Sequence, residues 1–371
     1  MIYFDNSAST FYKPPEVINA VKNALTFLPA NPGRSAHNAS IKGALLVEKT
    51  RERLQSLLNC EQVIFTDNCT GAINLALLGS AKKGHIVTTA LEHNAVLRTL
   101  HALKRSGVIT LSVVYPEPSG VISAEKIENA IKSDTYLVAI NHISNVTGAI
   151  APIDEIGKIC LHKGVKLFVD GAQSVGYEPI DMKKTGISML AVAPHKGLHA
   201  PQGVGALALR GEISLSPVRY GGTGTASSEL NQPNDLPEGF EAGTLPLPAI
   251  AGLCSALSWH EKNKERNRDK LFYLSRYLKE GLKSVGAELY LPEKAIDGIV
   301  SFNLPSLSSA TVSNILSSQY GICVRSGLHC APLVHEYLGT LKRGTVRVSL
   351  GCDNDEEEVE FFIEAIKNIM K

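Results

Sequence analysis

The sequence lacks the long apolar runs and the charge excess that would place it in several large protein classes. No run of about 18 apolar residues occurs, so we expect no transmembrane helix. The first residues, MIYFDNSAST, lack a basic segment followed by an apolar core, so we expect no signal peptide and a cytoplasmic location. With 37 basic and 36 acidic residues, the net charge of +1 provides no general attraction to nucleic acid or to an anionic membrane.

Paired cysteines are also missing. The seven cysteines form no C-x-x-C pair and their number is odd, which argues against a disulfide framework or a four-thiolate zinc site. Most of them are expected to be small buried residues. Cys330 differs because it follows His329 in the glycine-bearing stretch RSGLHCAP. It could be a buried thiol, a metal ligand or a nucleophile. The metal alternative is weak because His329, Cys330 and His335 lack a fourth ligand, so no metal site is predicted.

The chain contains apolar strand patterns that alternate with helical patterns. Its hydrophobic fraction of 44% and charged fraction of 20% are typical of a soluble globular protein. The apolar runs occur at residues 63–66, 86–89, 109–114, 137–140, 167–169, 189–193 and 204–209. Continuous apolar runs separated by helices indicate an α/β fold with a mostly parallel sheet that is covered on both faces.

The length of 371 residues exceeds one ordinary core, so we expect two domains. The composition changes near Trp259, where a charged helical pattern begins, followed by strand patterns at 299–303 and 345–350 and a final helix. We therefore predict a large domain at residues 15–259 and a smaller α+β domain at residues 260–371, which the N-terminal residues 1–14 join.

Two of the expected helices show apolar side chains at helical spacing. In the first helix these residues are Val17, Ile18, Val21, Leu25 and Leu28. In the charged helix they are Leu271, Phe272, Leu274, Tyr277 and Leu278. We expect each set to form the buried side of its helix.

Polar residues follow several of the predicted strands, at the edge where parallel sheets bind ligands. They are Asn145, Asp170, Gln173, His195 and Lys196, and the strand at 63–66 leads into a helix N-terminus near Thr70 that could hold a phosphate. Each residue alone has an ordinary explanation, such as a helix cap for Asp170, a surface position for Lys196 or a helix face for His93. Together, a lysine, a carboxylate, a phosphate cup and a stacking ring are what pyridoxal 5'-phosphate requires.

Nine ordered motifs resemble the class V aminotransferase family from residue 2 to about residue 351: DNSAST, NPGRSAH, EHNAVL, SNVTGAIAPI, VDGAQSVG, PHKG, FEAGT, VRSGLHCA and GTVRVSLG. Within that family they most resemble the cysteine desulfurases and selenocysteine lyases. The resemblance implies the fold of a fold-type I PLP-dependent transferase, with the cysteine loop carried by the smaller C-terminal domain.

The resemblance also implies a cofactor site. In it, Lys196 forms the Schiff base, Asp170 pairs with the pyridine nitrogen and His93 stacks on the ring. His195 and Thr70 contact the phosphate.

The remaining implied cofactor contacts come from two places. Asn145 and Gln173 face the ring hydroxyl. Gly243 and Thr244 would reach the phosphate bound by a neighbouring subunit, so a homodimer is implied.

The implied reaction is that of a PLP-dependent cysteine desulfurase, which converts L-cysteine to L-alanine and forms a persulfide on Cys330. Lys196, Cys330 and His93 are its implied catalytic residues. Arg347 would bind the substrate carboxylate, for which a guanidinium is well matched, with Arg325 and Asn145 beside it. Because a thiol must ionise to be a nucleophile, Arg325 or a protonated His329 would favour the thiolate.

The cysteine loop resembles that of the short-loop group II, since Arg347 follows Cys330 by only 17 positions. A short loop suggests that a dedicated sulfur-acceptor protein comes to the site. Three residues depart from the family pattern: Ala193 and Cys69 replace hydroxyl residues near the phosphate, and Leu328 replaces the first histidine of H-H-C-A. These departures bear on cofactor retention and on the preference between cysteine and selenocysteine.

Three other functions fit parts of the pattern. A selenocysteine lyase would use the same residues. Another class V aminotransferase or lyase would need a different substrate and would not need Cys330. A non-catalytic sulfur-trafficking subunit would need neither Lys196 nor Asp170, so the presence of both counts against it.

Overall fold

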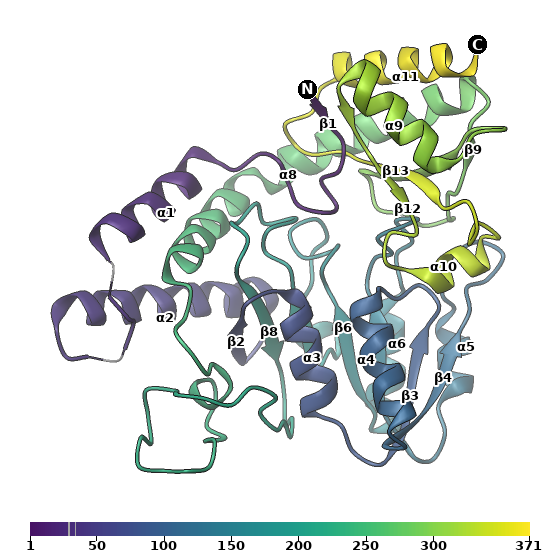
Figure 1. The fold of residues 1–371 in the computed structure, drawn as a ribbon. Coiled ribbons are helices and arrows are strands. Elements are labelled where there is room, and N and C mark those ends of the chain that lie inside the picture. Colours follow the sequence, from purple (N-terminus) through teal and green to yellow (C-terminus); the bar gives the residue numbers. More distant parts are fainter. Residues whose placement is uncertain (29, 34) are drawn as a thin grey trace.

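The computed structural model describes residues 1–28, 30–33 and 35–371 (Figure 1). A seven-stranded sheet forms the centre of the larger part. Its strands lie in the order β2 (Gln62–Thr66), β8 (Gly205–Leu209), β7 (Met189–Val192), β6 (Lys166–Asp170), β5 (Thr135–Asn141), β3 (Gly84–Thr89) and β4 (Ile109–Val114). The five strands from β7 to β4 are parallel, and β8 is antiparallel to both of its neighbours. The predicted mostly parallel sheet is confirmed, and each predicted apolar run overlaps one of its strands.

The strand register brings the carboxyl ends of the central strands together. Asn141 of β5 lies opposite Asp170 of β6, and Asp170 lies opposite Ala191 of β7. The polar residues that follow these strands therefore emerge along one edge of the sheet, as the sequence predicts.

Helices cover both faces of the sheet, because alternate strand residues point in opposite directions. Val138 and Val169 pack in one core with α2 (Asn38–Leu58) and α6 (Ile153–Lys163). Ala139 and Phe168 pack in the other core with α3 (Cys69–Gly79) and α4 (Asn94–Arg105). The shorter helices α5 (Ala124–Ala130), α7 (Met182–Thr185) and η1 (Glu238–Phe240) lie in the connections of this part.

A second, antiparallel sheet lies at the C-terminal end of the chain. Its strand order is β12 (Arg325–Gly327), β13 (Thr345–Ser349), β10 (Ile299–Asn303) and β9 (Glu288–Leu289). With it lie α9 (Ser309–Tyr320), α10 (Pro332–Tyr337) and α11 (Glu356–Met370) (Figure 1). The N-terminal strand β1 (Ile2–Tyr3) pairs in parallel with β11 (Ile322–Cys323), so the N-terminus lies against this part of the chain.

The helix α8 (Leu247–Ser284) links the two parts. Its 38 residues run without interruption from the large core, where Leu253 is buried, to the smaller core, where Leu274 is buried. The change of composition near Trp259 therefore falls inside a helix. The division into residues 15–259 and 260–371 stays a prediction.

Two predictions about buried helix faces are wrong in part. Phe272 is 50% exposed, because it follows buried Leu271 and is turned by about 100° around the helix axis. In α1 (Pro15–Phe27), Val17 is buried, whereas Ile18 and Leu25 are 56% and 64% exposed. The helix α1 packs against α8, and that contact covers only a narrow stripe of it. In the part of the chain that the structure describes, no helix is both long and apolar enough to cross a membrane.

Candidate active site

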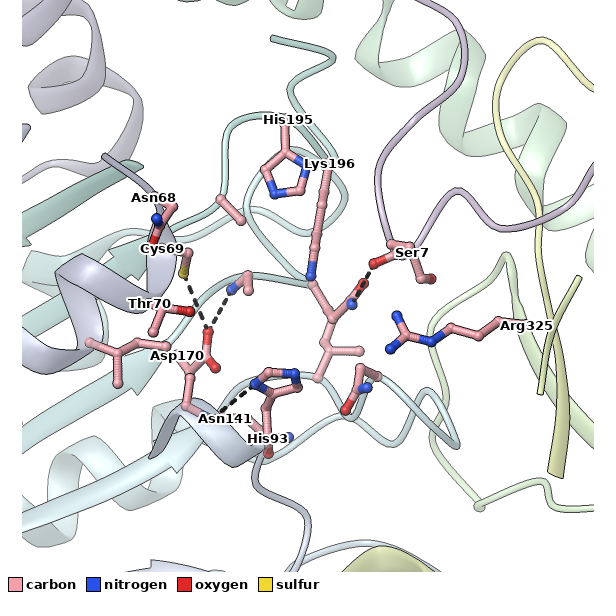
Figure 2. Close-up of a pocket in the computed structure, with 18 of the residues that line it drawn as sticks. Ser7, Asn68, Cys69, Thr70, His93, Asn141, Asp170, His195, Lys196 and Arg325 are labelled. Atoms are coloured by element: carbon pink, nitrogen blue, oxygen red, sulfur yellow. Dashed lines mark hydrogen bonds between the residues drawn. The ribbon is translucent and has the colours of Figure 1, made fainter. Parts of the chain in front are cut away.

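A cavity of about 230 Å³ lies at the carboxyl ends of β5, β6 and β7 (Figure 2). It brings together nine of the predicted site residues: Thr70, His93, Asn145, Asp170, Gln173, His195, Lys196, Arg325 and Arg347. Gly243 and Thr244 do not line it; they line a separate cavity beside β2 and α3. Cys330 is exposed on a loop that is bonded to the cavity wall.

Lys196 and Asp170 form the electrostatic centre of the cavity. Figure 2 shows the side chain of Lys196 extending into the cavity toward Asp170 and His93. Enclosure by the cavity lowers the pKa of the Lys196 amine, and the attraction of Cys69 and Asp170 opposes that shift. Burial raises the pKa of Asp170, although a hydrogen bond from the Ala172 amide (2.9 Å) and the charge of Lys196 oppose it. A buried carboxylate of this kind favours a cationic ligand group beside it.

His93 forms one wall of the cavity and begins α4. Its Nδ1 accepts a hydrogen bond from the Ala95 amide at 3.1 Å, so the imidazole also caps the helix. Burial lowers the pKa of His93 to about 4, and Lys196 and the nearby arginines lower it further in the same direction. The ring is therefore neutral at pH 7, which suits a flat surface that stacks on a ligand ring.

The N-terminus of α3 forms the other end of the cavity. The Asn68 side chain caps the helix by accepting a hydrogen bond from the Gly71 amide at 2.9 Å. Thr70 lies in the first turn and His195 lies nearby (Figure 2). Burial lowers the pKa of His195 to about 4, and its buried Nδ1 has no partner among the described residues. A helix N-terminus with a hydroxyl and an open imidazole nitrogen is suited to a phosphate.

Two arginines lie at the cavity side that faces the small sheet. Arg347 is 1% exposed, and its guanidinium donates to Asp5 Oδ1 at 2.7 Å and to the Asn145 carbonyl at 2.8 Å. Its Nε has no hydrogen-bond partner among the described residues. Arg325 of β12 lies opposite Arg347 in the antiparallel pairing, so both side chains come from one patch of the sheet. This patch is suited to a carboxylate.

Cys330 lies in the four-residue connection between β12 and α10. His329 and Cys330 both have left-handed backbone angles, with φ of 49° and 59°. A left-handed backbone is energetically unfavourable for residues other than glycine, and two hydrogen bonds stabilise it here. Asn145 donates to the His329 carbonyl at 2.7 Å, and the Asn94 amide donates to the Cys330 carbonyl at 2.7 Å. The loop is therefore attached directly to the cavity wall.

Of the two cations suggested for the thiol, the structure supports only Arg325. An Arg325 Nη2 lies 3.7 Å from Cys330 Sγ. The alternative of a protonated His329 is wrong, because burial lowers the pKa of His329 to about 2 and Arg347 and His335 lower it in the same direction. Its Nε2 lies 3.1 Å from the Thr345 carbonyl, so the neutral ring positions the loop.

The residues present fit pyridoxal phosphate. Four buried polar atoms around the cavity have no partner within the described ranges, namely Asn145 Oδ1, Gln173 Oε1, His195 Nδ1 and Arg347 Nε. Buried polar atoms are normally paired, so these atoms indicate a missing polar ligand. A pyridine nitrogen, a ring hydroxyl and a phosphate match the donors and acceptors that the cavity offers. Groups of three or more metal-ligating side chains do not occur in residues 1–28, 30–33 and 35–371.

Several cavity residues were not predicted. Ser7 and Asn141 line the cavity, and Asp5 pairs with Arg347. Asp5 and Ser7 belong to the quoted motif DNSAST, so that motif carried the signal. Glu92 beside His93 is fully buried, and only the tertiary structure shows this.

The three residues that depart from the family pattern lie at the cavity or on the cysteine loop. Ala193 is buried and lines the cavity. The Cys69 thiol lies 4.0 Å from Asp170 Oδ1, and burial raises its pKa, so the thiol is a neutral donor to the carboxylate. Leu328 is 36% exposed on the cysteine loop.

The chain is similar to known proteins over nearly its whole length. A model of the class-V aminotransferase family matches residues 2–362. A probable cysteine desulfurase of Pyrococcus abyssi is 33% identical over 387 residues, covering 100% of this chain and 94% of that relative. The cysteine desulfurase IscS of Clostridium botulinum is 30% identical over 394 residues, with coverage of 100% and 94%.

The structure of a cysteine desulfurase from Thermococcus onnurineus NA1, solved in its apo form, is also similar. It superposes with a TM-score of 0.91 at 32% identity, covering 99% of this chain and 94% of that one. The predicted fold of a fold-type I PLP-dependent transferase is confirmed. The assignment of the loop to the short-loop group stays a prediction.

Proposed function

The chain belongs to the class-V aminotransferase family, and we propose that it is a PLP-dependent cysteine desulfurase that converts L-cysteine to L-alanine. One observation carries the proposal. A cavity that holds both Lys196 and Asp170 is bonded, through Asn145 and the His329 carbonyl, to a loop on which Cys330 is exposed beside Arg325. The relatives named cysteine desulfurase support the same reaction.

Pyridoxal phosphate, when bound, supplies a ring that accepts electron density from the substrate Cα. Lys196 would hold the cofactor covalently and, once the substrate amine has freed it, would take the Cα proton with an amine of lowered pKa. Asp170 would keep the pyridine nitrogen protonated, and the neutral His93 ring would stack on the cofactor. Thr70 and His195 would hold the phosphate, while Asn145 and Gln173 would face the ring hydroxyl.

Arg347 and Arg325 orient the substrate. The Arg347 guanidinium is fixed by Asp5 and by the Asn145 carbonyl, so it can bind a carboxylate without losing further side-chain freedom. Binding there places the β-carbon and the sulfur of L-cysteine toward the Cys330 loop.

Cys330 receives the sulfur. Its thiolate, favoured by Arg325, attacks the substrate sulfur, and a sulfur–sulfur bond forms as the bond between that sulfur and Cβ breaks. The electron pair of the broken bond stays on Cβ, which takes up a proton, and the proton taken by Lys196 is returned to Cα, so alanine leaves and a persulfide remains. No external oxidant or reductant is needed for this step.

We also propose a homodimer. Gly243 and Thr244 lie outside the cavity of their own subunit, where they could reach a phosphate bound by another. The segment between β8 and η1 has no helix or strand, and it exposes Tyr220 (75%) and Leu230 (101%). Apolar side chains on such a segment support a subunit contact.

The short cysteine loop supports a dedicated sulfur-acceptor protein. Cys330 is exposed, but hydrogen bonds to the carbonyls of His329 and Cys330 fix its loop. A persulfide that cannot move far must be met by its acceptor. Selenocysteine would fit the same residues as cysteine. The cytoplasmic location stays a prediction from the sequence.

The test is alanine release from L-cysteine in the presence of a thiol reductant. We expect the intact, cofactor-loaded protein to release alanine and to carry a persulfide on Cys330, detected by mass spectrometry. Cys330→Ala should keep the cofactor and lose the release, whereas Cys60→Ala, a half-buried control, should keep both. Full activity in Cys330→Ala would mean that the cysteine is incidental and favour another class V reaction.

A further inference from the structure

A second groove, with a volume of about 700 Å³, borders the wall of the active-site cavity. Residues 121–125 at the start of α5, residues 150–155 at the start of α6, and Glu293 and Lys294 line it. His142 lines this groove, whereas its neighbours Asn141 and Ile143 line the active-site cavity. One backbone segment thus separates the two sites. In Figure 1, α5 lies beside β4, and α6 packs against α5.

The groove is strongly acidic although the whole chain is nearly neutral. Five carboxylates and one lysine line it: Glu125, Asp154, Glu155, Glu178, Glu293 and Lys294. None of the five carboxylates forms an ion pair within the described part of the chain. Three of them lie in the first turns of α5 and α6, where the helix dipole alone explains them. Glu178 and Glu293 lie outside any helix, so this explanation does not apply to them.

His142 provides an independent indication of a ligand. Its side chain is 5% exposed, and its Nδ1 has no hydrogen-bond partner among the residues described. Burial lowers the pKa of His142 to about 4, and the charge of Asp154 only partly opposes this. The ring is therefore neutral at pH 7, with a nitrogen that a ligand can satisfy. A cationic N–H donor would suit both this nitrogen and the surrounding carboxylates.

We propose that the groove binds a basic segment of a partner protein, whose lysine or arginine side chains pair with the carboxylates while one N–H group bonds to His142. The distribution of the carboxylates favours a protein segment over a small amine. Glu125, Asp154, Glu155 and Glu293 are exposed at the rim, and they come from three separate segments. A small-molecule site would enclose its ligand, whereas an exposed charged rim is typical of a protein interface.

Hydrogen bonds connect the groove with the helix that follows Cys330, so a protein bound in the groove would affect the reaction. Tyr337, at the end of the helix that follows Cys330, donates a hydrogen bond to the Glu117 carbonyl at 2.7 Å. The Glu293 amide donates to the Ser119 carbonyl at 2.9 Å. Residues 117–121 therefore connect the Cys330 element with both rims of the groove. If the proposed function holds, on which this step rests, a docked protein lies beside the persulfide and is placed to receive sulfur.

The experiment uses the cofactor-loaded full chain and a fluorescein-labelled octapeptide in which glycine alternates with lysine and arginine. Fluorescence anisotropy should show saturable binding. Glu125→Gln/Glu293→Gln should weaken it about tenfold, since two exposed ion pairs are lost. His142→Phe should weaken it without a change of charge. The matched control Glu357→Gln/Glu360→Gln, on exposed positions of α11, should bind like the parent.

Three outcomes would overturn the proposal. One is the absence of saturable binding. Another is equal weakening by the groove and control variants, which would mean general electrostatic attraction. The third is full displacement by spermidine at equal cation concentration, which would identify a polyamine site. Because binding needs no turnover, a chain that binds the peptide but releases no alanine would refute the proposed function and leave the groove proposal standing.

Discussion

The cofactor cavity and the Cys330 loop differ in how the fold holds them. Asp170 lies at the end of the parallel strand β6 and Lys196 follows the parallel strand β7, so the sheet register positions them and burial shifts the pKa of both. The loop has four residues, two of them with left-handed φ, and its cysteine is exposed. Groups whose charge must be controlled are thus placed in the sheet, and the group that must meet a partner is placed on a loop.

The largest effect is expected for a substitution that changes the cavity and leaves the Cys330 loop intact. Lys196→Ala should reduce the rate of alanine release. Loss of the general base alone costs about 10²–10⁴-fold, and loss of the covalent attachment of the cofactor adds to it. Borohydride reduction and mass spectrometry should find no cofactor linked to the chain. Alkylation of Cys330 by iodoacetamide should keep its rate, because Arg325 is unchanged.

The exposed Lys183→Ala serves as the control for this prediction and should behave like the parent protein. A cofactor that remains covalently linked in Lys196→Ala would place the attachment at another lysine. A large loss of Cys330 reactivity would show that the loop depends on the cavity more closely than their separate anchoring suggests.

A smaller effect is expected on the loop itself. Arg325→Gln removes a cation 3.7 Å from Cys330 Sγ. Exposed charge pairs contribute at most about 1 kcal/mol, so the rate of Cys330 alkylation at neutral pH should fall by up to about fivefold. Arg276→Gln, an exposed arginine on α8, is the control. An unchanged rate would mean that Arg325 acts on the substrate carboxylate alone.

The same contrast explains what the sequence could predict. The continuous apolar runs identified every strand of the large sheet, because a strand buried on both faces is apolar throughout. Strand ends were underestimated where polar residues such as His85 and Lys166 still pair through their backbone. The uninterrupted α8 and the antiparallel β8 were not predicted, since local composition does not determine pairing direction or helix continuity.

Within the site, the polar residues that follow the strands and the family resemblance together predicted which side chains line the cavity, but not their charge states. The neutral His329 is an example: burial lowers its pKa most, and Arg347, which approaches it only in the fold, lowers it in the same direction. Glu92 is another, since a glutamate in LEHNAVLR has no local sign of burial. Protonation depends on burial and on neighbours that are distant in sequence.

The last prediction tests this point in the buried region. Glu92 accepts a hydrogen bond from Thr89 at 2.6 Å, and its other oxygen has no partner among the described residues. Burial raises the pKa of Glu92 to about 8. In the unfolded chain the group loses its proton near pH 4.5, so between about pH 4.5 and 8 the folded state holds one more proton. The free energy of unfolding therefore falls as the pH rises through this window, by about 1 kcal/mol per pH unit from this group.

Glu92→Gln keeps the shape and the acceptor oxygen but cannot titrate, so its unfolding free energy should decline less steeply with pH. Urea unfolding at pH 5.5, 6.5 and 7.5 would measure the difference between the two proteins, at equal cofactor saturation. Glu357→Gln, at an exposed position, should keep the parent slope. If Glu92→Gln had that slope as well, Glu92 would be ionised in the folded protein. The segment beside His93 would then contain a second buried negative charge in addition to Asp170.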